Sequence, residues 1–254
     1  MAANIDQKTL AYINMYGVLG GLVALCDTVP EARKILGRSG CSVGFAVKGG
    51  PQATLTFVGG RCILKEGVED AAIRIPFSSP DKFNGMVNGT VTPIPTKGIT
   101  KISFLLGKFQ KLTNLLETYL RPTEEQLEDE TFLRQSTTIL FRVIVSAVAQ
   151  IANHDKVGQF SASNIVDGAI RIEIAGLAKA ALIAKDHTLT FSQKVPKNIM
   201  SYMQFADVKT ARDLFDGRIN SVAAVGDGLV RIGGMVSQID NVNRILSRVE
   251  LYLR

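Results

Sequence analysis

Apolar residues along the chain switch from helical spacing to alternation and back again. Residues 9–26 form an apolar helical stretch, and Pro30 opens a second short helix that runs to Leu36, because proline suits the first helical turn. Apolar and polar residues then alternate, which is typical of short strands with one buried face. The alternating segments are 43–47, 53–57, 62–64 and 73–77, with Gly-Gly turns at 49–50 and 59–60. We expect a meander of antiparallel strands.

Helical spacing returns after this meander. Pro76 removes a ladder donor, so its strand should lie at a sheet edge or end there. A short helix over 80–88 is closed by Gly89 as its C-terminal cap. Residues 99–104 read as another strand, and the spacing of Leu105, Phe109, Leu112, Leu116 and Tyr119 predicts an amphipathic helix.

The same order of predicted elements occurs a second time, about 127 positions later in the sequence. A buried helix over 138–152 precedes strands and a turn at Asp186-His187, and a final helix carries an apolar stripe from Ile239 to Leu253. The strands of this copy are expected at 170–174, 180–184, through Phe191, near 199–205 and around 229–233, with a short helix ending at Gly217. Pro122 marks the boundary between the two copies, so we expect two repeats, 1–122 and 123–254.

Composition limits the classes of protein that fit this pattern. Apolar residues make up 46% and charged residues 20% of the chain, so long disorder is excluded. No run reaches the roughly 18 apolar residues of a membrane span, and the N-terminus lacks the basic start of a secretory signal. The cysteines Cys26, Cys41 and Cys62 have no Cys-x-x-Cys spacing, which indicates free buried thiols and a cytoplasmic protein.

The positive charge is confined to the first repeat. Residues 1–122 hold 14 Lys and Arg against 8 Asp and Glu, whereas residues 123–254 hold 15 against 15. A basic face could contact an anionic membrane or an acidic partner, or could simply be a solvated surface. Nucleic acid is disfavoured, because there is no Trp, no dense basic run and no interleaving of aromatic with basic residues.

The sequence contains no pattern typical of a catalytic, metal or nucleotide-binding site. His154 and His187 lie far apart in polar contexts and read as solvated loop residues, and no cluster has metal-ligand spacing. The glycines of 226–233 are misplaced for a dinucleotide fingerprint, and those of 37–40 lack the P-loop lysine. We therefore expect no catalytic residue, no metal and no cofactor.

One stretch of the second repeat resembles the sterol-carrier-protein-like family of lipid-binding domains. Asp207, the run 214–219 and the run 228–234 follow that family's order of an acidic residue, Leu-x-x-Gly-basic-aliphatic and Gly-x-x-x-aliphatic-x-Gly. The first repeat matches more loosely, with Thr90 replacing the basic residue and Ser103 the last glycine. The chain thus looks like a tandem duplication of such a domain.

The resemblance implies an α+β fold: two copies of a five-stranded, mainly antiparallel sheet, with helices packed on one side and an apolar tunnel between them. Several apolar residues are candidates for lining a ligand site, although ordinary core packing would explain each of them. In the second repeat they are Leu182, Phe191, Tyr202, Met203, Phe205, Leu214, Phe215, Ile232 and Met235. In the first repeat they are Phe57, Ile75, Phe77, Phe83, Met86, Ile102 and Phe104.

These observations favour a non-enzymatic protein that binds or transfers a fatty acyl or sterol-like lipid by burying it. The alternative is a structural or regulatory interaction module whose cores are filled, and an enzyme acting on a lipid-like substrate is the least favoured. If the repeats divide the work, we expect the ligand in the second and a docking surface, for an anionic membrane, on the first. The sequence leaves open whether the chain forms a homo-oligomer.

Overall fold

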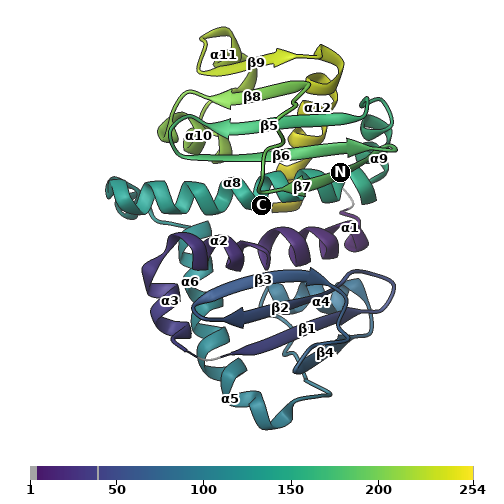
Figure 1. Ribbon diagram of the computed structural model, residues 1–254, viewed down its shortest axis with the longest axis vertical. Coiled ribbons are helices and arrows are strands. Elements are labelled where there is room, and N and C mark those ends of the chain that lie inside the picture. The colour runs from purple at the N-terminus through teal and green to yellow at the C-terminus, as the bar shows by residue number, and fades with distance from the viewer. Residues whose placement is uncertain (1–4, 39, 254) are drawn as a thin grey trace. The chain divides into compact units, whose positions relative to one another are not determined.

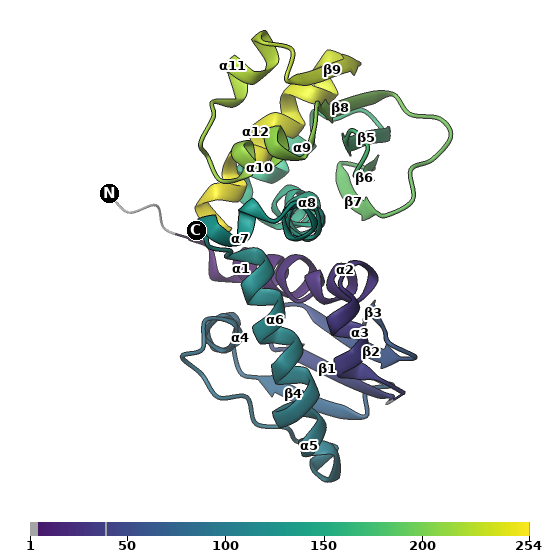
Figure 2. The same ribbon diagram turned by 90° about the vertical axis from the view of Figure 1, so that its left-hand side faces the viewer.

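The computed structural model describes residues 5–38 and 40–253. The chain divides into two compact units, Met1–Thr123 and Glu124–Arg254. Each unit is an α+β body in which helices cover one face of a sheet (Figures 1 and 2). The boundary between the units lies beside Pro122.

The first unit contains a four-stranded sheet of order β3-β2-β1-β4. Its strands are β1 (Cys41–Val47), β2 (Gln52–Val58), β3 (Arg61–Glu66) and β4 (Ile73–Phe77). Its N-terminal helices are α1 (Gln7–Tyr12), the π-helix η1 (Ile13–Val18), α2 (Gly21–Thr28) and α3 (Pro30–Leu36). After the sheet come α4 (Pro80–Val87), the 3₁₀ turn η2 (Ile99–Lys101), α5 (Ile102–Phe104), the π-helix η3 (Leu105–Phe109) and α6 (Gln110–Leu120).

The second unit contains a five-stranded sheet of order β7-β6-β5-β8-β9. Its strands are β5 (Gly168–Ile174), β6 (Ala178–Lys185), β7 (Thr188–Ser192), β8 (Ser201–Phe205) and β9 (Val230–Gly234). Its helices are α7 (Glu124–Glu128), α8 (Glu130–His154), α9 (Lys156–Ala162), α10 (Val208–Phe215), α11 (Ser221–Gly226) and α12 (Val236–Leu253). The first four strands of both units therefore follow one order.

The expectation of mainly antiparallel sheets is wrong, because both sheets are mixed. β4 pairs in parallel with β1, and β8 pairs in parallel with β5. Consequently β3 and β4 run in the same direction, and residues 67–72 cross the sheet to join them. Gly44 makes room for this crossing, since a Cβ there would lie 2.6 Å from the Cβ of Ala71. The alternating pattern predicted the strands but carried no information on their direction.

The expectation of five strands in the first unit is also wrong. Residues 99–104, predicted as a strand, form the helical segments η2 and α5. What remains of a fifth strand is one bridge between Arg74 and Lys97, with hydrogen bonds of 3.2 Å from Arg74 N and 2.9 Å from Thr96 N. Pro93 and Pro95 cannot donate to a ladder, which prevents the segment from extending its pairing. Gly98, at φ +81°, then turns the chain into the helix.

The elements with strong periodicity were predicted correctly. The helix from Pro30 to Leu36 and the strand 73–77 have the expected bounds, and β4 lies at the sheet edge, as expected from Pro76. The predicted helix 80–88 is α4, followed by Gly89 at φ +74°. The short helices α9 and α11 were not predicted, because neither is long enough to show a period.

In each unit a polar side chain joins the short helix after the fourth strand to the first helical stretch: α4 to α1 and η1 in the first unit, and α10 to α8 in the second. Asn84 of α4 donates to the carbonyl of Gln7 at 2.9 Å and accepts from Asn14 at 3.0 Å. Arg212 of α10 donates to Ser136 of α8 at 2.9 Å. Asn84 and Arg212 are each the fifth residue after the helix N-cap, Ser79 or Asp207. The two units therefore share this contact as well as their strand order.

Two helical stretches, Gln7–Thr28 and Glu130–His154, are long and apolar enough to cross a membrane by length and composition alone. Within the structure, 67% and 78% of their most apolar windows are buried. Such burial is what a core helix of a globular unit shows.

Candidate functional site

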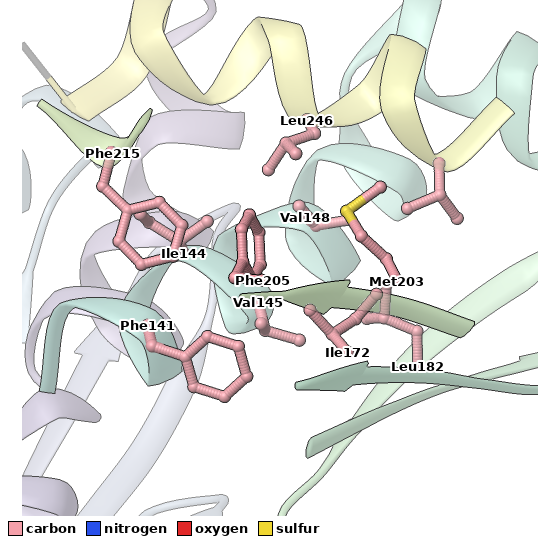
Figure 3. A pocket seen from close by; sticks show the side chains of 11 residues that line it. Phe141, Ile144, Val145, Val148, Ile172, Leu182, Met203, Phe205, Phe215 and Leu246 are labelled. Atoms are coloured by element: carbon pink, nitrogen blue, oxygen red, sulfur yellow. The ribbon is translucent and has the colours of Figure 1, made fainter. Parts of the chain in front are cut away.

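A small apolar cavity lies between the sheet and the helices of the second unit. Its wall is made by side chains from α8, from the inner face of β5, β6 and β8, from the end of α10 and from α12 (Figure 3). The lining residues are Phe141, Ile144, Val145, Val148, Ile172, Leu182, Met203, Phe205, Phe215, Val242 and Leu246. Every one of these side chains is apolar, so the cavity offers no hydrogen-bond partner from a side chain.

The cavity is small. Its volume is about 20 Å³, counted as the room open to the centre of a water-sized sphere. That is enough for about one water molecule, and a cavity with apolar walls stays dry. A lipid chain therefore needs the wall to move before it can enter.

Phenylalanine rings occupy the corresponding core positions of the first unit. Phe45 pairs with Ala53 and Ile75 in the way that Ile172 pairs with Ala180 and Met203, so Phe45 and Ile172 occupy the same place. The same registers match Phe57 with Ala184. Phe83 and Ala211 match because each is the fourth residue after a helix N-cap.

One of these replacements lies at the cavity, since Ile172 belongs to its lining. The ring centroids of Phe45 and Phe83 lie 6.2 Å apart, and those of Phe77 and Phe83 lie 5.3 Å apart, which is ordinary aromatic packing. The second unit has the smaller side chains of Ile172, Ala184 and Ala211 at the positions of Phe45, Phe57 and Phe83. The difference lies in side-chain size and not in the order of the strands.

Helix α12 closes the cavity and is held near its C-terminal end by Asp155. Two nitrogens of Arg248 meet this carboxylate, with Nε 2.7 Å from Oδ1 and Nη2 donating to Oδ2 at 2.8 Å. The hydroxyl of Tyr252 donates to Oδ2 at 2.7 Å, and the N–H of Gly158 donates to Oδ1 at 2.9 Å. Asp155 thus joins the start of α9 to the end of α12.

These contacts change the ionisation of both charged groups. Burial opposes the charged form of Asp155, but the hydrogen bonds from Arg248, Gly158 and Tyr252 outweigh it and hold the pKa of Asp155 below its ordinary value. The hydrogen bond to Asp155 raises the pKa of Arg248. The pair is therefore ionised throughout the neutral range.

A second polar contact holds the N-terminal end of α12. Ser201 donates to Gln238 Oε1 at 2.6 Å, and Gln238 Nε2 donates to the carbonyl of Val166 at 2.7 Å. Ser201 also accepts from the N–H of Met235 at 3.0 Å. The place of Ser201 is taken in the first unit by Ile73, as the strand registers show. Between the two polar contacts, α12 presents Val242 and Leu246 to the cavity.

Of the residues expected to line a site in the second unit, Leu182, Met203, Phe205 and Phe215 lie at the cavity. Tyr202 points to the opposite face of the sheet, where the guanidinium of Arg171 lies 5.3 Å from its ring centroid. The remaining candidates lie outside the lining. Phe191, Leu214 and Met235 are half-buried, and Ile232 is exposed.

The candidates of the first unit form its aromatic core. Phe57, Ile75, Phe77 and Phe83 are buried, and the rings of Phe57 and Phe104 lie 5.5 Å apart. Met86 is half-buried on α4, and Ile102 is exposed on α5. The structure thus brings Phe57, Ile75, Phe77 and Phe83 into the core, with Phe104 against Phe57, and leaves Met86 and Ile102 outside it.

Sequence reasoning missed the helical part of the cavity wall. Phe141, Ile144, Val145 and Val148 come from α8, and Val242 and Leu246 come from α12. Their apolar stripes predicted buried helices, and that burial was the available signal. Nothing in the stripe distinguishes residues that touch a cavity from residues that touch another side chain.

Within residues 5–38 and 40–253, no group of three or more His, Cys, Asp or Glu side chains could hold a metal ion. His187 is an exposed turn residue, as expected, but His154 ends α8 and does not lie in a loop. The cysteines Cys26, Cys41 and Cys62 are free and buried, which confirms that expectation.

Solved structures similar to this chain include two domains described in relation to sterol carrier protein 2. One, described as UbiJ-SCP2 ubiquinone synthesis protein, is 13% identical over 42% of this chain and 88% of its own, with a TM-score of 0.34. The other, sterol carrier protein 2 from Yarrowia lipolytica in its apo form, is 15% identical over 39% and 91%, with a TM-score of 0.30. No protein-family model and no curated protein sequence matches the chain. At these TM-scores, neither likeness adds to the argument from the cavity.

Proposed function

We propose that the second unit binds an apolar ligand, a fatty acyl chain or a sterol-like lipid, without catalysing a reaction. The observation that carries this proposal is the cavity wall, in which all 11 side chains are apolar. Burial would supply the affinity, at about 0.8 kcal/mol for each methylene removed from water. The shared strand order and the pattern from Asp207 to Gly217 support kinship of both units with the sterol-carrier-protein-like family, by duplication.

Entry of a ligand would require α12 to move away from the sheet. Val242 and Leu246 are the side chains that α12 contributes to the wall, and they lie between its two polar contacts. Because the first unit is filled by phenylalanine rings, we assign the ligand to the second unit alone.

Filling the cavity tests this proposal. Ile172→Phe introduces the ring that Phe45 supplies at the same place in the first unit, and it should abolish saturable binding of a fluorescent fatty acid to the full chain. Ile75→Met is the matched control: it gives the first unit the residue that Met203 supplies in the second, and it should leave binding unchanged. Thermal unfolding of both variants shows whether the fold is kept.

Three outcomes would contradict the proposal. The wild-type chain could bind neither fluorescent fatty acid nor any lipid that mass spectrometry detects after extraction. Ile172→Phe could bind as well as the wild type while remaining folded. Equal occupancy of both units would contradict the assignment to the second unit.

A second candidate function is an interaction module with filled cores. The volume of about 20 Å³ favours it, since a lipid does not fit the cavity in this conformation. Crystals grown with a long-chain fatty acid separate the two candidates. Density for the acyl chain beside Met203 and Leu246 supports the lipid binder, whereas an unchanged α12 and a dry cavity support the interaction module.

A further inference from the structure

Residues 94–111 of the first unit combine exposed apolar side chains with exposed lysines, and we call them the 94–111 segment. Ile94, Ile99 and Leu106 are 74%, 65% and 69% exposed, and Ile102 is 39% exposed. Such exposure is high for large aliphatic residues so close together in sequence. The segment lies at the end of the unit opposite α1 and α2 (Figures 1 and 2).

The helix of this segment is apolar on both sides. Phe104 and Phe109 pack inward, with ring centroids 5.5 Å and 6.0 Å from that of Phe57. These two residues are five apart, and the π-helix Leu105–Phe109 brings such a pair onto one side, because its hydrogen bonds join residues five apart. Ile102 and Leu106 face solvent instead. Large apolar side chains on both sides of a helix are normally buried, and here only one side is covered.

Along the sequence, the charges near these residues have one sign. Residues 82–116 contain five lysines and no aspartate or glutamate, and the nearest acidic residues along the chain are Asp81 and Glu117. Lys97, Lys101 and Lys111 are exposed. Lys108 is half-buried and donates to the carbonyl of Leu36 at 2.8 Å, so it is held by the unit itself. The exposed apolar side chains therefore lie close in sequence to three exposed lysines.

From this geometry we infer that the 94–111 segment docks the protein on an anionic lipid bilayer. The exposed aliphatic side chains of the segment would enter the boundary between headgroups and acyl chains. The lysines beside them would be attracted to the negative membrane surface. A second copy of the chain is a poorer occupant, since it would set lysines against lysines. The inference rests on the surface of the first unit and does not depend on the cavity of the second.

Vesicle binding by the full chain tests the electrostatic part. The protein should sediment with vesicles of phosphatidylcholine and phosphatidylserine, bind much less to phosphatidylcholine alone, and be released by salt. The triple change Lys97→Glu, Lys101→Glu and Lys111→Glu should lower the partition coefficient at least about 100-fold. The matched control Lys185→Glu, Lys194→Glu and Lys197→Glu makes the same change in net charge on exposed lysines of the second unit, and it should keep most of the binding.

Aliphatic variants test the insertion part. Ile99→Ser with Leu106→Ser should lower partitioning about tenfold or more, because each change removes buried apolar area. The control is Val222→Ser with Val236→Ser, at residues 76% and 79% exposed in the second unit. Binding without preference for phosphatidylserine, or an equal loss in either control, would overturn the inference. All these positions are on the surface, and circular dichroism verifies that the variants fold.

Discussion

Asp155 accepts hydrogen bonds from the backbone of α9 and from two side chains of α12. Replacing it with asparagine keeps the size of the side chain but removes the charge that Arg248 meets. We expect Asp155→Asn to lower the free energy of unfolding by about 2 kcal/mol, as for hydrogen bonds to a charged group. Denaturant titration measures this change.

The chain provides a control for that substitution. Arg244 and Asp240 form an exposed pair on α12 at 3.1 Å, with side chains 61% and 54% exposed. Exposed pairs of this kind contribute about 0–1 kcal/mol. Asp240→Asn should therefore change stability much less than Asp155→Asn, and equal effects would show that the contact to Asp155 does not hold α12.

The depressed pKa of Asp155 predicts how this contact depends on pH. A carboxyl group whose pKa is lower in the folded state stabilises the fold above its unfolded pKa of about 3.9. That contribution is lost as the pH falls through the folded value. The stability difference between wild type and Asp155→Asn should thus be constant near neutrality and shrink below about pH 4. A difference that is largest in acid would contradict the sign of this pKa shift.

At the level of elements, the two β-hairpin turns offer a direct comparison. Gly59 and Gly60 join β2 to β3 with positive φ, and Asp186 and His187 join β6 to β7 at φ 49° and 62°. The left-handed region costs about 1–2 kcal/mol for residues other than glycine. We expect His187→Gly to stabilise the second unit by about 0.5–1 kcal/mol after the extra flexibility of the unfolded chain is subtracted.

The reverse change is the control for the hairpin. Gly60→His places a side chain at φ 75° in the first unit and should destabilise it by a similar amount. Calorimetry of both variants compares the two turns. Opposite signs support the conformational explanation, and destabilisation by both changes would contradict it.

Elements with a clear period could be predicted from the sequence, and local exceptions could not. Alternation located β1 to β8, but the parallel pairing of β4 depends on how residues 67–72 cross the sheet at Gly44. The strand expected at 99–104 has apolar residues that also suit a helix, and the choice is decided by Pro93, Pro95 and the turn at Gly98. The π-helix η3 changes the spacing by one residue, which a search for 3.6-residue periods does not detect.

At the level of the whole molecule, the two units share an order of strands and differ in the filling of their cores. The sequence predicted two repeats, located the apolar positions and showed the charge difference, and four of the candidate residues in the second unit lie at the cavity. It did not show the cavity, because a volume depends on how facing side chains add up. Phe45 and Ile172 both look like core residues in the sequence, and their sizes alone do not show which of them borders a cavity.

The cavity in the second unit has a consequence for unfolding under pressure. Pressure favours the state of smaller volume, and unfolding eliminates internal voids, so a unit with a void unfolds at lower pressure than a filled one of similar stability. In high-pressure NMR, we expect signals of the second unit to lose their native shifts before those of the first. Ile172→Phe should reduce the difference in unfolding pressure between the two units. An unchanged difference would show that the volume lost on unfolding does not come from the cavity.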